Sequence, residues 1–241
     1  MSIIEKKNLE RIQFYVTTKY SCGYINGQDA QSIVATPHKN INRKIFEGLI
    51  NEGFRRSGPY VYKPNCISCN ACVPIRLLAS KFIASRSQKR AAKYLEKLTV
   101  KILPLKFNEE HYELYVHYQN KRHLDTGKSE DEIGDYNDFL IKSNVESKIV
   151  EFRLGNKLKI VTIVDIVDDG LSAVYTFYDC SNRKLSLGTI SIMWLLNYCK
   201  KQNLSFLYLG YWINESKKMK YKTNFKPYEL MVDGAWQEVS G

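Results

Sequence analysis

The chain has 241 residues, of which 44% are hydrophobic and 12% aromatic, and this excludes a wholly disordered protein because so much apolar material can form a core. Lysine and arginine number 36 against 25 acidic residues, and the resulting net charge of +11 favours a polyanionic partner such as nucleic acid. No apolar run approaches the roughly 18 residues of a membrane span, and the charged N-terminal residues do not match a signal peptide, so we expect a cytoplasmic globular protein without membrane association.

The first half of the chain combines short strands with helices. Alternation and β-branched content predict strands at residues 12–18, 60–62, 76–82 and 99–105. Helical spacing of apolar residues predicts helices at residues 41–52, 86–98 and 109–122. Asn40 is the expected cap of the first helix and Gly53 its stop. Ser85 and Gln88 form a capping-box pattern at the start of the second helix.

The second half is more regular. A polar loop is expected at residues 124–135, followed by three β-rich runs that turn chemistry separates into an antiparallel meander, at residues 147–154, 158–167 and 171–178. A helix, a strand, a short basic helix and a hairpin are then expected, at residues 187–200, 206–209, 215–221 and 229–239.

This order of elements predicts an α/β (α+β) fold. A meander followed by helix, strand, helix and strand is typical of acetyltransferase (GNAT)-like acyl-transfer domains. We place a boundary near residue 100, with an N-terminal cysteine-bearing subdomain at residues 1–100 and a GNAT-like acyltransferase domain at residues 101–241.

Three cysteines, Cys66, Cys69 and Cys72, stand two residues apart from one another, a spacing that lets thiolates share one metal ion. Cys22 is the natural fourth ligand if the first strands bring it near. Four thiolates suit zinc or an iron–sulfur cluster, and a reduced cluster packed without metal accounts for the same spacing.

The helix that begins after Ser85 is basic, and Arg86, Lys89 and Arg90 place cations on successive turns, where they can contact the phosphates of RNA or form an ordinary solvated face. The four histidines lack metal-ligand spacing, and no Ser/His/Asp triad can be assembled. Neither a P-loop nor a dinucleotide-binding glycine motif is present, which argues against nucleotide hydrolysis and dinucleotide redox chemistry.

Several segments, taken together and in order, resemble the bacterial aminoacyl-tRNA–protein transferases known as aspartate/glutamate leucyltransferases. The segments that carry this resemblance are residues 53–58, 62–66, 69–76, 85–90, 168–179, 186–189, 208–213, 219–222, 225–229 and 234–236. The resemblance implies an enzyme that moves leucine from Leu-tRNA onto proteins beginning with Asp or Glu, which directs them to degradation by the N-end rule. It also implies relatives in eukaryotes that transfer arginine, some of them with an iron–sulfur cluster.

The expected reaction is aminolysis of an ester, and it requires no cofactor for the chemistry and no covalent enzyme intermediate. Arg86, Lys89 and Arg90 are the candidates for the tRNA, and Arg56, Arg76 and Lys222 for the acidic side chain of the acceptor, because arginine pairs bidentately with carboxylates. An apolar slot for leucine is expected at Tyr175, Phe177 and Tyr211. The candidate catalytic groups, expected to orient the α-amine, are Tyr175 and Asp179.

Three alternatives stay open at this stage. The first is arginyl transfer, since donor choice depends on the shape of a pocket. The second is a non-catalytic RNA-binding module with a structural metal site, which explains the charge and the cysteines but not the ordered match in the second half. The third is a small-molecule acetyltransferase, which needs a pyrophosphate loop richer in Gly and Arg than residues 186–189.

Overall fold

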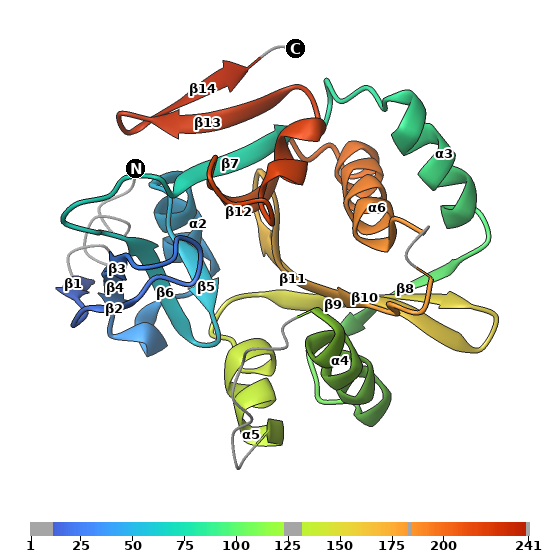
Figure 1. Ribbon diagram of the computed structural model, residues 1–241, viewed down its shortest axis with the longest axis horizontal. Helices are drawn as coiled ribbons and strands as arrows, with labels where there is room; N and C mark the ends of the chain where they lie inside the picture. The colour runs from blue at the N-terminus through green and yellow to red at the C-terminus, as the bar shows by residue number, and fades with distance from the viewer. Residues whose placement is uncertain (1–11, 123–131, 183–184, 240–241) are drawn as a thin grey trace.

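A computed structural model describes residues 12–122, 132–182 and 185–239 of the chain. Within these residues lie a four-stranded sheet, an eight-stranded sheet and a two-stranded ribbon, with helices on both faces of the large sheet (Figure 1). This arrangement confirms the predicted α/β class. In the part of the chain that is described, no helix is long and apolar enough to cross a membrane.

The four-stranded sheet is antiparallel and comes entirely from the first 64 residues. In spatial order its strands are β1 (Gln13–Val16), β4 (Ser32–Thr36), β6 (Tyr60–Pro64) and β5 (Arg55–Ser57). The ribbon of β2 (Tyr20–Ser21) and β3 (Asp29–Ala30) lies beside it.

Helix α2 (Arg43–Asn51) buries its apolar face, Ile45, Phe46, Leu49 and Ile50, in a core that it shares with the four-stranded sheet and with β10 of the large sheet. The predicted cap was wrong by two residues. Asn42 accepts the Ile45 N–H at 3.1 Å, because Asn40 already belongs to the short helix η1 (His38–Asn40).

The eight-stranded sheet crosses the molecule. In spatial order its strands are β14 (Ala235–Val239), β13 (Tyr228–Val232), β7 (Val73–Leu78), β12 (Phe206–Trp212), β11 (Gly170–Tyr178), β10 (Lys157–Val167), β9 (Ser147–Leu154) and β8 (Thr99–Pro104). The meander β9–β10–β11 and the hairpin β13–β14 are confirmed. The boundary predicted near residue 100 falls within the edge strand β8, and the large sheet contains strands from both sides of it, because β7 precedes that residue and lies in the middle of the sheet.

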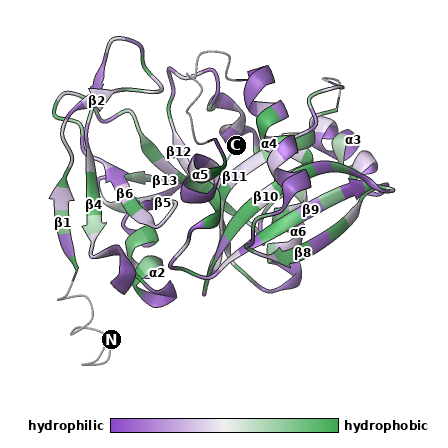
Figure 2. Cartoon of the chain, turned by 90° about the horizontal axis from the view of Figure 1, so that it is seen from below, coloured by the Kyte–Doolittle hydropathy of each residue, from purple (hydrophilic) through white to green (hydrophobic). Residues whose placement is uncertain are grey.

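Helices cover both faces of the large sheet (Figure 1). On one face, α6 (Leu187–Lys201) packs on the strands, and α3 (Arg86–Leu95) packs on α6. On the other face lie α4 (Glu109–Arg122), α5 (Glu132–Tyr136) and the π-helical turn η2 (Asn137–Ile141). Apolar residues run along β9 and β10 between these two layers (Figure 2), so the core is continuous through the sheet.

Three predicted elements differ from the structure. Residues 132–136 form a helix rather than a loop, anchored by the buried Tyr136, while residues 124–131 of that predicted loop lie outside the described residues. The strand predicted at residues 76–82 begins and ends earlier, at Val73–Leu78. The basic helix predicted at 215–221 is replaced by the 3-10 helix η3 (Lys220–Asn224), whose position follows from the burial of Lys222 and Phe225.

Candidate active site

The parallel strands β11 and β12 are hydrogen-bonded only at their first residues. Residues 170–172 pair with residues 206–208, although β11 continues to Tyr178 and β12 to Trp212. Gly210 has a φ of +78° and lies within a register shift between β12 and β7. Glycine adopts this backbone conformation without strain. The sheet therefore has an interruption between β11 and β12, beginning just after Ser172.

The side chain of Arg55 occupies this interruption. Its Nη2 donates to the Ala173 carbonyl at 2.6 Å and its Nη1 lies 3.3 Å from Ser172 Oγ, both on β11. On the β12 side it packs so closely that a Cβ added to Gly210 would lie 3.0 Å from Arg55 Cζ. Burial lowers the pKa of this guanidinium. Arg55 is not among the site residues predicted from the sequence. The signal that could have indicated it is its position directly before the predicted Arg56.

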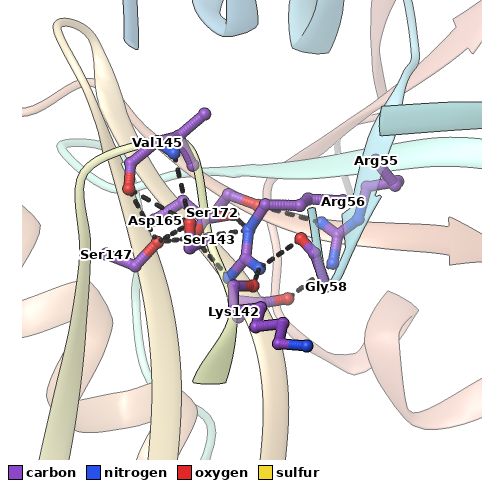
Figure 3. A network of polar contacts seen from close by, with 10 residues as sticks. Arg55, Arg56, Gly58, Lys142, Ser143, Val145, Ser147, Asp165 and Ser172 are labelled. Carbon is purple, nitrogen blue, oxygen red and sulfur yellow. Dashed lines mark hydrogen bonds and ion pairs between the residues drawn. The ribbon is translucent and has the colours of Figure 1, made fainter. Parts of the chain in front are cut away.

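Arg56, a predicted acceptor-binding residue, is already paired inside the protein (Figure 3). Its Nε lies 3.0 and 2.9 Å from the two Asp165 carboxylate oxygens, and its Nη2 lies 2.8 Å from Oδ1. Its Nη1 donates to the Gly58 and Lys142 carbonyls. Both partners of the ion pair are buried. Arg56 therefore has no free guanidinium edge for an acceptor, and its role here is to join β5 to the meander.

Arg76 is also engaged by its own protein. Its Nε donates to Glu229 at 2.5 Å, across the β7–β13 pair, and its guanidinium lies 3.6 Å from the Phe206 ring centroid. Tyr208 and Asn51 accept further hydrogen bonds from Nη1. These contacts fix Arg76 as a structural cation rather than as a free carboxylate receptor.

Tyr211 and Lys222, two further predicted substrate-binding residues, are brought together next to Arg55. The Lys222 ammonium donates to the Tyr211 carbonyl at 2.6 Å, and the Tyr211 hydroxyl donates to the Gly53 carbonyl at 2.9 Å. Burial, and then the charge of Arg55, lower the pKa of Lys222 to about 7. Arg55 and Lys222 are therefore two neighbouring cations, of which the arginine keeps its charge at neutral pH.

A cavity of about 770 Å³ lies between the ribbon, the small sheet and the cysteine loop. We call it the cysteine pocket, because all four predicted metal ligands line it, namely Cys22, Cys66, Cys69 and Cys72. Tyr24, Tyr62 and Tyr211 contribute aromatic walls. Each of these three tyrosines interacts electrostatically with Arg55, so the inner part of the pocket adjoins the interruption of the sheet.

The four thiols fit a metal by their chemistry, since thiolates bind zinc and iron–sulfur clusters. Their observed positions are less compact: among the described residues, no group of three cysteine, histidine or acidic side chains is arranged to hold a metal ion. Burial, followed by the other three thiols, raises the pKa of Cys72 to about 12. This favours a protonated thiol at neutral pH in the arrangement described.

The two predicted catalytic residues, Tyr175 and Asp179, have structural partners. The Tyr175 ring packs against Phe139 and Tyr115, in an aromatic cluster that also contains the fully buried Phe177. Phe177 is therefore core and cannot line a slot for leucine. Lys159 Nζ lies 2.6 Å from the Asp179 carboxylate. Although burial opposes it, this hydrogen bond and those from Ser181 lower the pKa of Asp179 to about 2.

The predicted tRNA-binding cations lie on one exposed helix. Arg86, Lys89 and Arg90 of α3 all point to solvent, and the predicted capping box is confirmed, with Ser85 Oγ accepting the Gln88 N–H at 3.3 Å. A second cavity, of about 460 Å³, opens at the start of α3. We call it the polar pocket, because hydroxyl and amide side chains and Lys226 dominate its lining. Tyr221 lines it too and interacts electrostatically with Arg55.

Comparison with known proteins gives matches along the whole chain. The models for the N terminus and the C terminus of arginine-tRNA-protein transferases match residues 20–90 and 110–232. The aspartate/glutamate leucyltransferase of Methylobacillus flagellatus is 50% identical over 99% of this chain and 96% of that protein. That of Thiobacillus denitrificans is 47% identical over 95% of each chain.

Among solved structures, L-PGS from Bacillus licheniformis has a TM-score of 0.48 at 10% identity, over 70% of this chain and 58% of that one. FemX has a TM-score of 0.44 at 9% identity, over 89% of this chain and 83% of that one. These similarities are too low to decide the GNAT-like assignment, which stays a prediction. The full-length sequence identity is decisive for the family: this chain belongs to the aspartate/glutamate leucyltransferases, which are aminoacyl-tRNA–protein transferases.

Proposed function

We propose that this enzyme transfers leucine from Leu-tRNA to the N-terminal α-amine of proteins whose first residue is Asp or Glu, and so directs them to degradation. The observation that carries this proposal is the 50% identity, over 99% of the chain, to a protein named for that reaction. Arginyl transfer is the less specific interpretation. It rests on the description of the family models, whereas several relatives of 38–50% identity are named leucyltransferases.

The reaction forms one amide bond and breaks one ester bond. The neutral α-amine attacks the leucyl carbonyl carbon, the ribose oxygen of the tRNA leaves, and the proton of the amine passes to that oxygen. An α-amine has a pKa of about 7.7–8.0, so a sizeable neutral fraction exists at pH 7 without a strong base. Positioning of the two reactants, which can contribute about 7–11 kcal/mol, is the main task of the protein.

Helix α3 and the polar pocket form the proposed tRNA surface. The exposed Arg86, Lys89 and Arg90 contact backbone phosphates of the acceptor stem, and the hydroxyl-rich polar pocket at the start of α3 receives the unpaired 3′ end. The exposed ring of Tyr221 offers a stacking surface for a base. Because Tyr221 also interacts with Arg55, this path leads from the basic helix to the interruption between β11 and β12.

The cysteine pocket forms the proposed entrance for the acceptor. The described residues that line it include a single charged side chain, Asp29, so aromatic, thiol and backbone groups are available to an extended peptide. Tyr211 stands between this pocket and the interruption, where it can contact the leucyl side chain. We place the reaction in the cytoplasm, where charged tRNA is available.

Metal binding by Cys22, Cys66, Cys69 and Cys72 is a separate proposal, supported by the presence of all four thiols in the lining of one pocket. A metal there would tie the ribbon to the cysteine loop and shape the acceptor entrance, and no step of the reaction passes through it. Metal analysis and visible absorption of anaerobically purified protein test this. Stoichiometric zinc or iron that is lost in Cys69→Ser supports it, and a metal-free, folded, active protein contradicts it.

A donor competition tests the proposed function. Purified protein receives equal amounts of Leu-tRNA and Arg-tRNA, each with a distinct isotope, together with a peptide beginning with Asp. We expect leucine at the peptide N-terminus and no arginine. Arginine as the main product would favour the alternative, and no transfer from either donor would contradict both.

A further inference from the structure

Three arginines surround the junction between the small and the large sheet, and they differ in their partners. Arg56 is paired with Asp165, and Arg76 with Glu229. Among the described residues Arg55 forms no ion pair or hydrogen bond with a carboxylate, and it interacts with Asp165, the partner of Arg56, only electrostatically. Of its five N–H groups, two are accounted for by Ser172 Oγ and the Ala173 carbonyl. Within residues 12–122, 132–182 and 185–239, the other three N–H groups of this half-buried guanidinium have no hydrogen-bond acceptor and are available to a ligand.

The Arg55 side chain is only partly buried. Its Nε is not among the described buried polar atoms that lack a hydrogen-bond partner, although no described residue accepts a hydrogen bond from it. The surrounding walls are largely phenolic, since Tyr24, Tyr62 and Tyr211 interact with Arg55 from the cysteine pocket and Tyr221 from the polar pocket. A carboxylate that reached Arg55 would thus meet a cation in a partly desolvated, aromatic setting, where ion pairs are stronger than in water.

The position also fits the geometry of the reaction. In an acceptor beginning with Asp or Glu, the α-amine and the acidic side chain belong to one residue, so the group that holds the carboxylate must lie beside the reacting centre. Arg55 lines neither pocket itself, but it interacts electrostatically with Tyr211 of the cysteine pocket, proposed for the acceptor, and with Tyr221 of the polar pocket, proposed for the 3′ end of the tRNA. Arg86, Lys89 and Arg90, on the exposed surface of α3, are assigned to the tRNA instead.

We infer that Arg55 is the specificity-determining residue that pairs with the side-chain carboxylate of the acceptor's first residue. This rests on the proposed function. Ser172 and Ala173 hold one side of the guanidinium, Gly210 provides space for it, and the remaining edge pairs with the carboxylate. An acceptor beginning with Asn or Gln has the same shape but leaves the cation unpaired, which costs binding free energy.

The test compares two peptides that differ only in Asp or Asn at the first position. Their dissociation constants, and their kcat and KM in leucine transfer, are measured for the wild type and for Arg55→Gln. We expect the wild type to prefer the Asp peptide. Arg55→Gln should weaken its binding by roughly 10- to 100-fold and change the Asn peptide little, because charged hydrogen bonds are the ones lost. Lys101→Gln, an exposed cation on the far edge strand, is the matched control and should leave the preference unchanged.

The outcomes separate this inference from the proposed function. A folded Arg55→Gln protein that keeps the preference for Asp overturns the inference, and so does an equal loss of kcat for both peptides with KM unchanged. If Arg55→Gln does not fold, Arg55→Lys keeps the charge without the two-pronged geometry and should lose part of the preference; an unchanged preference overturns the inference. A wild type that binds Asp peptides through Arg55 but transfers no leucine supports the inference and removes the proposed function.

Discussion

Two adjacent arginines on β5 have different roles because successive side chains of a strand point to opposite faces. Arg56 faces the meander and closes a buried ion pair with Asp165. Arg55 faces the interruption between β11 and β12, where its hydrogen-bond partners among the described residues, Ser172 and Ala173, are neutral. Arg56 thus stabilises the fold, whereas Arg55, one position earlier, is available to bind substrate.

Loss of Arg56 should destabilise the fold rather than alter selectivity. In Arg56→Met the Asp165 carboxylate is left buried without its partner, and breaking such a pair typically costs about 3–5 kcal/mol. Urea unfolding measures this directly. The double variant Arg56→Met with Asp165→Leu should recover much of the loss, because an apolar pair often replaces a buried ion pair without penalty. An Arg56→Met protein within about 1 kcal/mol of wild type would disprove the structural assignment.

Lys222 should make the stability of the protein increase with pH. Its pKa is about 7 in the folded protein, against 10.5 for an ordinary lysine. Between these values the unfolded chain holds a proton that the folded chain lacks, so the free energy of unfolding rises with pH. Relative to Lys222→Met, the wild type should gain about 2 kcal/mol between pH 7 and pH 9. A difference that stays constant with pH would contradict the burial of this ammonium group.

Local sequence patterns predicted the features that depend on neighbouring residues. They did not predict contacts between residues that are far apart in the chain. The capping box of Ser85 and Gln88 was correct because its two hydrogen bonds span three residues. Arg76 is engaged by Glu229, which lies 153 positions later in the chain, and Arg56 is engaged by Asp165, which lies 109 positions later. No pattern within a strand or helix reveals such partners, so the sequence alone does not distinguish the unpaired Arg55 from the paired Arg56 and Arg76.

Helix α3 presents its cations because its start is held in place and its inner face packs on α6. The capping box starts the helix, Gln88 Nε2 donates to the Asn224 carbonyl at 3.0 Å, and the helix packs on α6. Four basic side chains of the helix then remain exposed, namely Arg86, Lys89, Arg90 and Lys93, and the exposed Lys97 follows just after its end. Such a fixed basic surface suits the backbone of a duplex stem better than a mobile tail does.

This surface should show in the salt dependence of tRNA binding. Each of Lys89→Gln and Arg90→Gln should lower affinity for tRNA and reduce the slope of log K against log salt by about 1, as expected for one lost phosphate contact. Binding is measured at several salt concentrations, with Lys101→Gln as the control. Unchanged slopes in both α3 variants would remove the helix from the tRNA surface.

The order of elements predicted the meander, its helix and the final hairpin, because each is built from consecutive segments. The place of β7 was not predictable in this way. It precedes the meander by some 70 residues in the chain and yet separates β12 from β13. The large sheet therefore contains a strand from the cysteine-bearing half, which brings β5 and Arg55 next to β11 and β12.

In the whole molecule, Arg55 lies at the junction of the two sheets and interacts electrostatically with tyrosines that line the two pockets. The net charge of +11 and the basic helix favour RNA on the side of the polar pocket. On the other side, the cysteine pocket offers an uncharged approach apart from Asp29. This division lets one substrate carry many phosphates and the other a single carboxylate, without the two competing for the same groups.

An acceptor competition tests this account most directly. Leu-tRNA and the purified protein are mixed with equal amounts of four peptides that differ only in their first residue, Asp, Glu, Asn or Ala, and the leucylated products are measured by mass spectrometry. We expect leucine on the Asp and Glu peptides at least about tenfold in excess over the other two, as a charged hydrogen bond would provide. Equal transfer to all four peptides would contradict the recognition of a carboxylate at the centre of the molecule.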